Sequence, residues 1–537
     1  MPRKAKNKWT ETRLRQAVQA AIYDRHLRNM PVDKEAIRAR YMRKAPKHAR
    51  LITDFVISVR LQDFKDHLVG HLPGRAEAAQ PGPLLDLQWQ LLSADNDEEE
   101  ETRDTLLTEN AVLVSPLLES RGYRLPSQYA LLGKTVIAGD AIPDQRIMLN
   151  TNIPFSAFVC GVQGSGKSHT TACLIENCSM TIPSLGILQK SVSTLVLHFD
   201  EYRSTMSSQP SEAAFLARVM PQYGQERPLL LRVLVSPTNF HNLKKMYSQI
   251  PNIEVLPFKI QPKHLNVSMM LALMSVSQGG EMPLYMAQVT RVLRDMAMES
   301  GGYFDYCDFR ARLHALNLNR SQTPFLCQRL DLLDSYLDLA GETSGDYFVD
   351  GGVTILDLSC PFVDQSTACI LFRIAIELFL HAHASRGKMI VADEAHKYMT
   401  DTPAAKVLTE TFLAIIRQRR HLGVRTIIST QEPTISPRLI DLCSVTIIHR
   451  FTNPEWYKMI ERHVPMNRHN HGQHSEPIPD GIYQIAGLQT GEAIVFAPSA
   501  QLVEENGAVM DTKHQAFEMQ MRKRVTWDSG KTIVCVR

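Results

Sequence analysis

The sequence GVQGSGKS occupies residues 161–168 and matches the phosphate-binding loop G-x-x-x-x-G-K-[ST] at every required position. The preceding residues, AFVC (157–160), predict a short buried strand, and the following HTTACLIENC predicts the first turns of a helix. A strand, a glycine loop and a helix in that order form the context that this motif needs. The stretch therefore predicts an α/β fold that binds a nucleoside triphosphate.

Each residue type in this loop has a chemical reason. Glycines let the backbone curl so that successive N–H groups face a polyphosphate, and the dipole of the following helix favours the same anion. We expect Lys167 to reach the β- and γ-phosphates and the Ser168 hydroxyl to ligate Mg²⁺. The predicted ATP-binding residues are Gly161, Gln163, Gly164, Ser165, Gly166, Lys167, Ser168 and His169.

A second motif, KMIVADEAH (388–396), reads as an apolar strand that ends in Asp393 and Glu394. Two adjacent carboxylates at the end of a strand need partners, and a metal–triphosphate site supplies them. We expect Asp393 to support Mg²⁺ and Glu394 to polarise the attacking water. The predicted cofactors are thus ATP and Mg²⁺.

The letters DEAH also suggest a DEAH-box helicase, but the rest of the chain disfavours that class. Such helicases carry a second RecA-like domain after this strand, and the residues that remain here are needed to complete the first sheet. Their Q-R-x-G-R-x-G-R pattern is missing, and no N-K-x-D motif follows that would read guanine in a GTPase.

Two further strands end in polar residues. The strand VRTIIST ends at Gln431, where an amide can contact the γ-phosphate or the attacking water as a sensor. The strand in SVTIIHRFTNPEW is followed by Arg450, and a helix starts at Asn453-Pro454. An arginine at this place can reach the phosphates of a neighbouring subunit and stabilise charge in the transition state.

With these motifs in order, the chain resembles the HerA/FtsK superfamily of ring-forming ATPases. The resemblance rests on the phosphate loop, HFDEYRS (198–204), the DEAH strand, RQRRHLGVRTIISTQEP, HRFTNP and TGEAIVFAP (490–498). It covers about residues 130–500 and implies a RecA-like fold, a hexameric ring and ATP hydrolysis that moves DNA through a pore. The family glycine before the arginine pair is replaced here by Arg417-Gln418.

Strand and helix patterns alternate after residue 129, which predicts a mainly parallel α/β sheet. We expect an ATPase domain over residues 129–500, an all-helical insertion at about 281–345, and a C-terminal tail over 501–537. RHNHGQH (468–474) fits no standard zinc pattern and reads as a surface loop. The expected strands, besides 157–160, are 194–199, 229–235, 352–358, 389–392, 424–429, 445–449 and 493–497.

The N-terminal region differs sharply in charge from the rest. The first fifty residues contain fifteen Lys or Arg and four Asp or Glu. We expect residues 1–92 to be mainly helical, with a Thr10 cap, a second helix over 33–44 and a helix-turn-helix-like DNA-binding role. A solvated helix and a nuclear localisation segment remain alternatives. The acidic run SADNDEEEE opens a linker over 93–128.

Bulk properties limit the cellular setting. The 537-residue chain lacks an N-terminal signal peptide and any run of about twenty apolar residues. Its nine cysteines are scattered without C-x-x-C spacing, which favours free thiols in a reducing compartment. We expect a soluble intracellular protein of the nucleus or cytoplasm with no membrane partner.

The sequence predicts an ATP-hydrolysing ring motor of the HerA/FtsK type, a DNA translocase or helicase. DNA and further copies of the chain are its expected partners, and the existence of a nuclease partner is left open. The alternative is an ATP-switched oligomeric interaction protein that moves nothing. Both hypotheses share one nucleotide site, so the motifs do not separate them.

Overall fold

The structure is a computed structural model, and it divides into two compact units, 1–97 and 98–537. The acidic run 93–101, residues 202–208 and RHNHGQH (468–474) lie outside the described residues. Within the described ranges, no helix combines the length and the apolar character that crossing a membrane requires. The described residues are 9–27, 33–58, 108–136, 144–201, 209–224, 229–274, 285–300, 304–316, 323–341, 345–384, 386–466, 480–503 and 508–527.

The first unit is a small group of helices: α1 (Glu11–Leu27), α2 (Lys34–Lys44) and α3 (Ala49–Ser58). Asp33 caps α2 by accepting hydrogen bonds from two backbone N–H groups of its first turn. Apolar side chains at helical spacing bury together, which gives the unit its own core. That core contains Leu14, Val18, Ile22, Ile37, Tyr41, Ala45 and Ile52.

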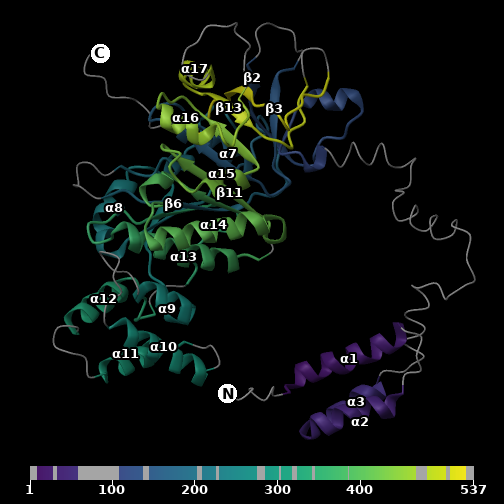
Figure 1. The fold of residues 1–537 in the computed structure, drawn as a ribbon. Helices are drawn as coiled ribbons and strands as arrows, with labels where there is room; N and C mark the ends of the chain where they lie inside the picture. Colours follow the sequence, from purple (N-terminus) through teal and green to yellow (C-terminus); the bar gives the residue numbers. More distant parts are fainter. Residues whose placement is uncertain are drawn as a thin grey trace, which may run out of the picture. The chain divides into compact units, whose positions relative to one another are not determined.

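The second unit is built on one large sheet whose central strands are all parallel (Figure 1). This arrangement confirms the predicted RecA-like α/β class, since continuous apolar strands between helices are typical of parallel sheets. Their spatial order is β12 (Val445–Ile448), β4 (Ser156–Cys160), β11 (Val424–Thr430), β10 (Lys388–Ala392), β6 (Ser193–His198), β9 (Val353–Asp357), β7 (Leu231–Val235) and β8 (Ile253–Pro257).

Beyond β12 the sheet continues with antiparallel strands, and here the predicted boundaries were wrong. Residues 501–537 were expected to be a tail, but β14 (Phe517–Met521) enters the sheet between β13 (Glu492–Phe496) and β2 (Tyr129–Thr135). The last strands are β3 (Arg146–Asn150) and β1 (Leu113–Val114), and β5 (Gly186–Ile187) pairs with β2.

The expected linker over 93–128 therefore also ends too late, because β1 and the 3-10 helix η2 (Pro116–Arg121) fall within it. The two boundaries have different causes. Strand β1 is only two residues long and is held by pairing with β3, so a local pattern carries little signal for it. Strand β14 alternates strictly between apolar and polar residues, and the sequence analysis missed this signal.

Helices cover both faces of the parallel strands, and each strand alternates between two cores. Phe158 and Cys160 face the core under α13 (Gln365–His381) and α14 (Pro403–Leu422), whereas Ala157 and Val159 face the core under α7 (Lys167–Ser179) and α8 (Phe240–Tyr247). Helix α14 confirms the predicted start and stop signals, with Thr402 as its N-cap and Gly423 in the left-handed region at its end.

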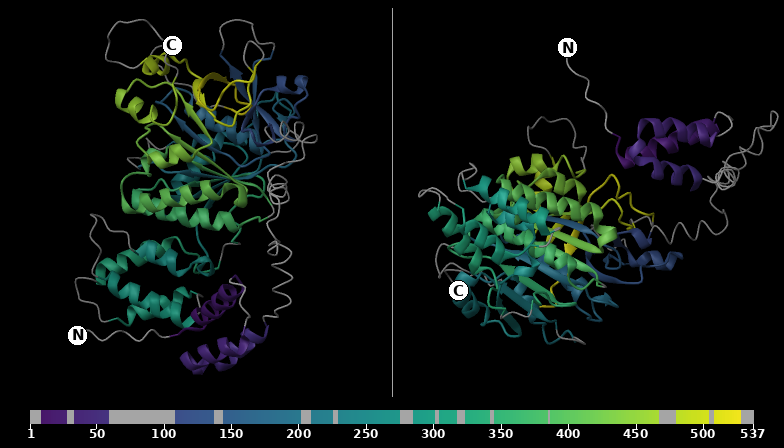
Figure 2. Two further views of the ribbon diagram at one scale, coloured as in Figure 1. Left: turned by 45° about the vertical axis from the view of Figure 1, so that its right-hand side comes forward. Right: turned by 90° about the horizontal axis from the view of Figure 1, so that it is seen from below.

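A helical insertion leaves the sheet after β8 and returns at β9 (Figures 1 and 2). It begins earlier than the expected residue 281, because α9 already belongs to it, and α9 contacts α13. The insertion shares the α13 and α14 core rather than forming a free domain. Its helices are α9 (Val267–Met274), α10 (Met286–Ser300), α11 (Tyr306–His314) and α12 (Thr323–Ser335).

Candidate nucleotide site

The candidate site lies where five neighbouring parallel strands end. Parallel strands present their carboxyl ends at one edge of a sheet, and ligands of open α/β sheets bind there. In the spatial order β12, β4, β11, β10 and β6, these ends carry the phosphate loop and nearly all of the polar residues that the motifs singled out. The acid pair follows β10, and β11 lies between β10 and the strand of the phosphate loop.

The phosphate loop runs from β4 into α7 with the backbone that its glycines permit. Gly164 and Gly166 have φ values of 77° and 109°, a region that side chains other than glycine rarely adopt. A Cβ on Gly161 would lie 2.6 Å from the Cβ of His449, so only glycine fits there. Within the loop, the buried Ser165 donates its hydroxyl to the carbonyl of Val162 at 2.7 Å, while Gln163 is exposed.

The loop lysine and the second acid of the DE pair are in direct contact. Lys167 Nζ forms an ion pair with Glu394 Oε1, and their side chains are 4% and 13% exposed. Glu394 itself has φ 48° and ψ 44°, a left-handed backbone conformation that is costly for a residue with a side chain. Such strain clusters at functional sites, where the surrounding structure holds it. The Glu394 carboxylate is therefore held at the phosphate loop.

The first acid, Asp393, pairs with a residue that the sequence analysis quoted only within a motif. His198, at the end of β6, places Nδ1 3.9 Å from Asp393 Oδ2, an ion-pair distance rather than a hydrogen bond. Burial acts to raise the pKa of Asp393, but His198 and Lys167 outweigh it, and the pKa is lowered. Burial acts to lower the pKa of His198, but Asp357 and Asp393 outweigh it, so this pKa is raised. Asp393 is therefore a buried carboxylate.

Ser168 and Asp393 line the same small pocket between α7, β10 and the 3-10 helix η3 (Glu212–Ala217). Among the described residues, no group of three or more His, Cys, Asp or Glu is arranged to hold a metal ion by itself. A hydroxyl and a carboxylate fit the hard oxygen donors that Mg²⁺ prefers when phosphates and water complete its coordination.

His396 connects Glu394 with the end of β11. Its Nδ1 lies 3.5 Å from Glu394 Oε2 and accepts a hydrogen bond from the backbone N–H of Gln431 at 3.4 Å. Burial lowers the pKa of His396, so it favours the neutral ring that can accept this bond. The backbone of Gln431 thus lies beside His396, and the sensor role of its amide stays a prediction. His396 is a candidate site residue that motif reasoning left without a role.

The loop is also held from the side of β12. Val162 N–H donates to the carbonyl of Arg450 at 3.1 Å, which places the backbone of Arg450 next to the phosphate loop. The guanidinium of Arg450 is half-buried and makes no hydrogen bond or ion pair with the described residues. The Arg450 guanidinium can therefore pair with an anionic group from outside the described residues.

His449 is a third histidine that the sequence analysis quoted only within a motif. It is fully buried between the loop and β13, its Nδ1–H donates to the carbonyl of Glu492 at 2.9 Å, and its Nε2 accepts from the Thr170 hydroxyl at 2.8 Å. Burial is the main cause that lowers the pKa of His449 to about 4. The ring therefore stays neutral at pH 7 and ties α7 to β13.

The low pKa of His449 makes the free energy of unfolding depend on pH in a predictable direction. Between about pH 6.5 and pH 4 the unfolded chain protonates His449 while the folded chain does not, so stability falls as pH falls, by on the order of 3 kcal/mol in total. We expect His449→Gln, which cannot titrate, to lose less stability than the unmodified protein between pH 7 and pH 5. Thermal unfolding at several pH values measures this, with exposed His421→Gln as the control. Equal pH dependence in all three proteins would contradict the assignment.

Comparisons with known proteins give the following result. No model of a protein family matches the chain, and neither does any curated protein. Among solved structures, VirB4 of Thermoanaerobacter pseudethanolicus is 10% identical, covers 74% of this chain and 97% of its own, and has a TM-score of 0.44. The genome packaging NTPase B204 of Sulfolobus turreted icosahedral virus 2 is 10% identical over 67% of this chain and 96% of its own, with a TM-score of 0.27.

The pCW3 conjugation coupling protein TcpA is also 10% identical, over 74% of this chain and 66% of its own, with a TM-score of 0.25. At these scores the similarity is partial, and the assignment of the fold rests on this chain's own strand order and motifs. The phosphate loop follows β4, the acid pair follows β10, and β11 with Gln431 lies between them. With its motifs in this order, the chain has a RecA-like α/β fold with a phosphate-binding loop after β4.

Proposed function

We propose that this protein is an ATP-hydrolysing motor of the HerA/FtsK type that assembles as a ring, with a hexamer expected, and acts on DNA. The observation that carries the proposal is the ion pair of Lys167 with Glu394, together with the pocket shared by Ser168 and Asp393. A cation, a hydroxyl and two carboxylates converge at the start of α7, and this set suits a metal-bound triphosphate.

The residues divide the work in a way that follows from their positions. The N–H groups of residues 164–168 and the amino end of α7 hold the phosphates, and Lys167 neutralises their charge. Ser168 and Asp393 would hold Mg²⁺, which supplies further charge neutralisation on the phosphate oxygens. Glu394 lies close to Lys167, where it can take a proton from an attacking water.

Two substitutions separate binding from turnover. We expect Lys167→Ala to lose ATP affinity, because the loop loses its cation. Glu394→Gln should retain ATP binding and lose hydrolysis by a factor of about 10² or more, because an amide is a poor base. Steady-state phosphate release and the binding of a fluorescent ATP analogue measure the two effects.

The matched controls are the exposed Lys245→Ala and Glu461→Gln, which should behave as the unmodified protein does. Unchanged hydrolysis in both Lys167→Ala and Glu394→Gln would overturn the proposed site.

Stimulation of ATPase activity by double-stranded DNA at low salt would support the motor. If hydrolysis is present without such stimulation, the ATP-switched interaction protein is the better description.

Variants of Arg450 test whether the active site is shared between neighbouring subunits of a ring. We propose that its unpartnered guanidinium reaches the nucleotide of a neighbouring subunit and stabilises charge in the transition state. Arg450→Ala and Lys167→Ala should each be inactive alone. Mixed rings join an intact loop of one chain to an intact Arg450 of the next, so mixing the two variants should restore measurable phosphate release. Mixtures as inactive as the single variants would rule out action across subunits.

The basic N-terminal unit supports DNA as the partner. Helix α2 exposes Arg38, Arg40, Arg43 and Lys44, and such a cluster binds phosphates in a salt-dependent way. Replacing these four with Gln should weaken binding to duplex DNA and make it less sensitive to salt. Fluorescence anisotropy over a range of salt concentrations measures both effects. The double variant Lys244→Gln and Lys245→Gln on α8 is the control, and equal salt slopes in the two proteins would contradict the proposed role.

A further inference from the structure

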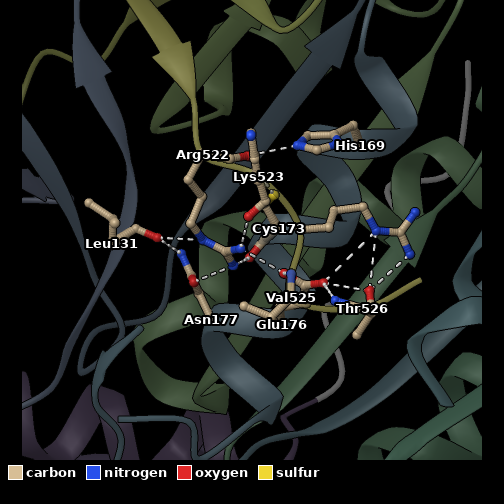
Figure 3. Close-up of polar contacts among 10 residues, drawn as sticks. Leu131, His169, Cys173, Glu176, Asn177, Arg522, Lys523, Val525 and Thr526 are labelled. Atoms are coloured by element: carbon tan, nitrogen blue, oxygen red, sulfur yellow. Dashed lines mark hydrogen bonds and ion pairs between the residues drawn. The ribbon is translucent and has the colours of Figure 1, made fainter. Parts of the chain in front are cut away.

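One face of α7 is occupied by the chain that follows β14. His169, Cys173, Glu176 and Asn177 recur along that face at helical spacing, and all four contact Arg522 (Figure 3). This stretch of the C-terminal chain is therefore packed along the helix that begins in the phosphate loop.

Arg522 makes these contacts with two different groups. Its backbone carbonyl accepts a hydrogen bond from His169 Nε2 at 2.7 Å, one residue beyond Ser168. Its guanidinium donates to Glu176 Oε2 at 2.8 Å, to Asn177 Oδ1 at 2.8 Å and to the carbonyls of Cys173 and Leu131 at 3.2 and 2.8 Å. One residue thus contacts α7 in its first turn and about 10 Å further along its axis, and it also joins α7 to β2.

Glu176 is the centre of a buried charged network (Figure 3). Its side chain is 0% exposed, and those of Arg522 and Arg524 are 6% and 2% exposed. The carboxylate also accepts from the N–H groups of Val525 and Thr526 at 3.4 and 3.1 Å and from the Thr526 hydroxyl at 2.5 Å. Such groups fix geometry closely, because each charge is costly to bury without its partners.

A second route leads from the same strand to the phosphate loop itself. Met521, the last residue of β14, donates its N–H to the carbonyl of Gly491 at 2.9 Å, and Gly491 N–H donates to the carbonyl of Ser165 at 3.2 Å. The neighbouring Thr490 donates its hydroxyl to the carbonyl of Gly164 at 3.4 Å. The end of β14 is therefore hydrogen-bonded to the loop through Gly491 and to the helix through Arg522.

We propose that the segment 517–526 positions the phosphate loop, with Arg522 and Glu176 as its positioning residues. The inference rests on the proposed function, because it assigns these residues to the ATP site of the same chain. Neither side chain reaches the loop residues that would hold phosphate. Each acts through α7, whose rotation and tilt set where the loop N–H groups and Lys167 point. Small misplacements of such groups cost much in binding and rate.

Two substitutions test the role. Arg522→Gln should raise the Kd for ATP about tenfold or more in protein that is still folded. The Kd for ATP of Arg522→Lys should lie between those of the unmodified protein and Arg522→Gln. An ammonium keeps the charge but lacks the forked donors that reach Glu176 and Asn177 together. Arg218→Gln is the control. Arg218 stacks on Trp527, which follows the last residue that contacts Glu176. Thermal unfolding confirms that each variant is folded at the temperature of the binding assay.

A purely structural role would lower only the unfolding temperature. Unchanged Kd and kcat in folded Arg522→Gln therefore overturn the inference, while the unmodified protein still binds and hydrolyses ATP. Failure of the unmodified protein to bind ATP would instead overturn the proposed function. The two results are distinguishable in one set of assays.

Hydrogen exchange decides the question if the Arg522 variants do not fold. Coupling between two sites is reciprocal, so ATP bound at the loop should slow exchange at the amides of Val525 and Thr526, which donate to Glu176. The measurement uses the full unmodified chain with and without ATP, and Lys167→Ala as the protein that does not bind. ATP binding without any change in exchange over 517–526 would overturn the inference.

Discussion

The buried ion pair of Lys167 with Glu394 joins two chain segments that lie 227 residues apart in the sequence. A charge of either sign alone would be costly at this degree of burial, so each residue requires the other or a ligand in its place. A triphosphate offers such a ligand, since its oxygens can pair with the lysine and free the carboxylate for a water. The buried lysine that pairs with Glu394 is therefore also the group that can bind a phosphate.

The strand order of the sheet brings the two partners of this contact to one edge. Because β12, β4, β11, β10 and β6 are neighbours and parallel, their ends deliver the loop, the acids, His198, Gln431 and Arg450 to one edge. The antiparallel strands add mechanical support rather than chemistry. His449 and Gly491 hold the loop from β12 and β13, and Arg522 holds its helix from β14. The candidate site is thus fixed from several sides by residues outside the phosphate loop and the acid pair.

The sequence predicted the parts that depend on local patterns. The expected apolar strands, the glycine loop and the capped helix α14 carry strong short-range signals, and all of them occur where we expected, whereas the parallel strand β8 was not expected. His198 and His449 had no such signal, because each simply ends an apolar strand and acquires its partner only in the folded sheet. Strand β14 is different, because Phe517–Met521 alternates strictly between apolar and polar residues, a strand signal that the sequence analysis missed. Pairing with β13 and β2 buries its three apolar residues.

The central claim is that one triphosphate binds between the phosphate loop and the acid pair. The most direct measurement is an experimental structure of the full chain with ATPγS and Mg²⁺. We expect the γ-phosphate within hydrogen-bonding distance of Lys167 Nζ, the metal beside Ser168 and Asp393, and the Glu394 carboxylate facing the γ-phosphate. A nucleotide bound elsewhere, or phosphates that lie away from residues 161–168, would contradict the account.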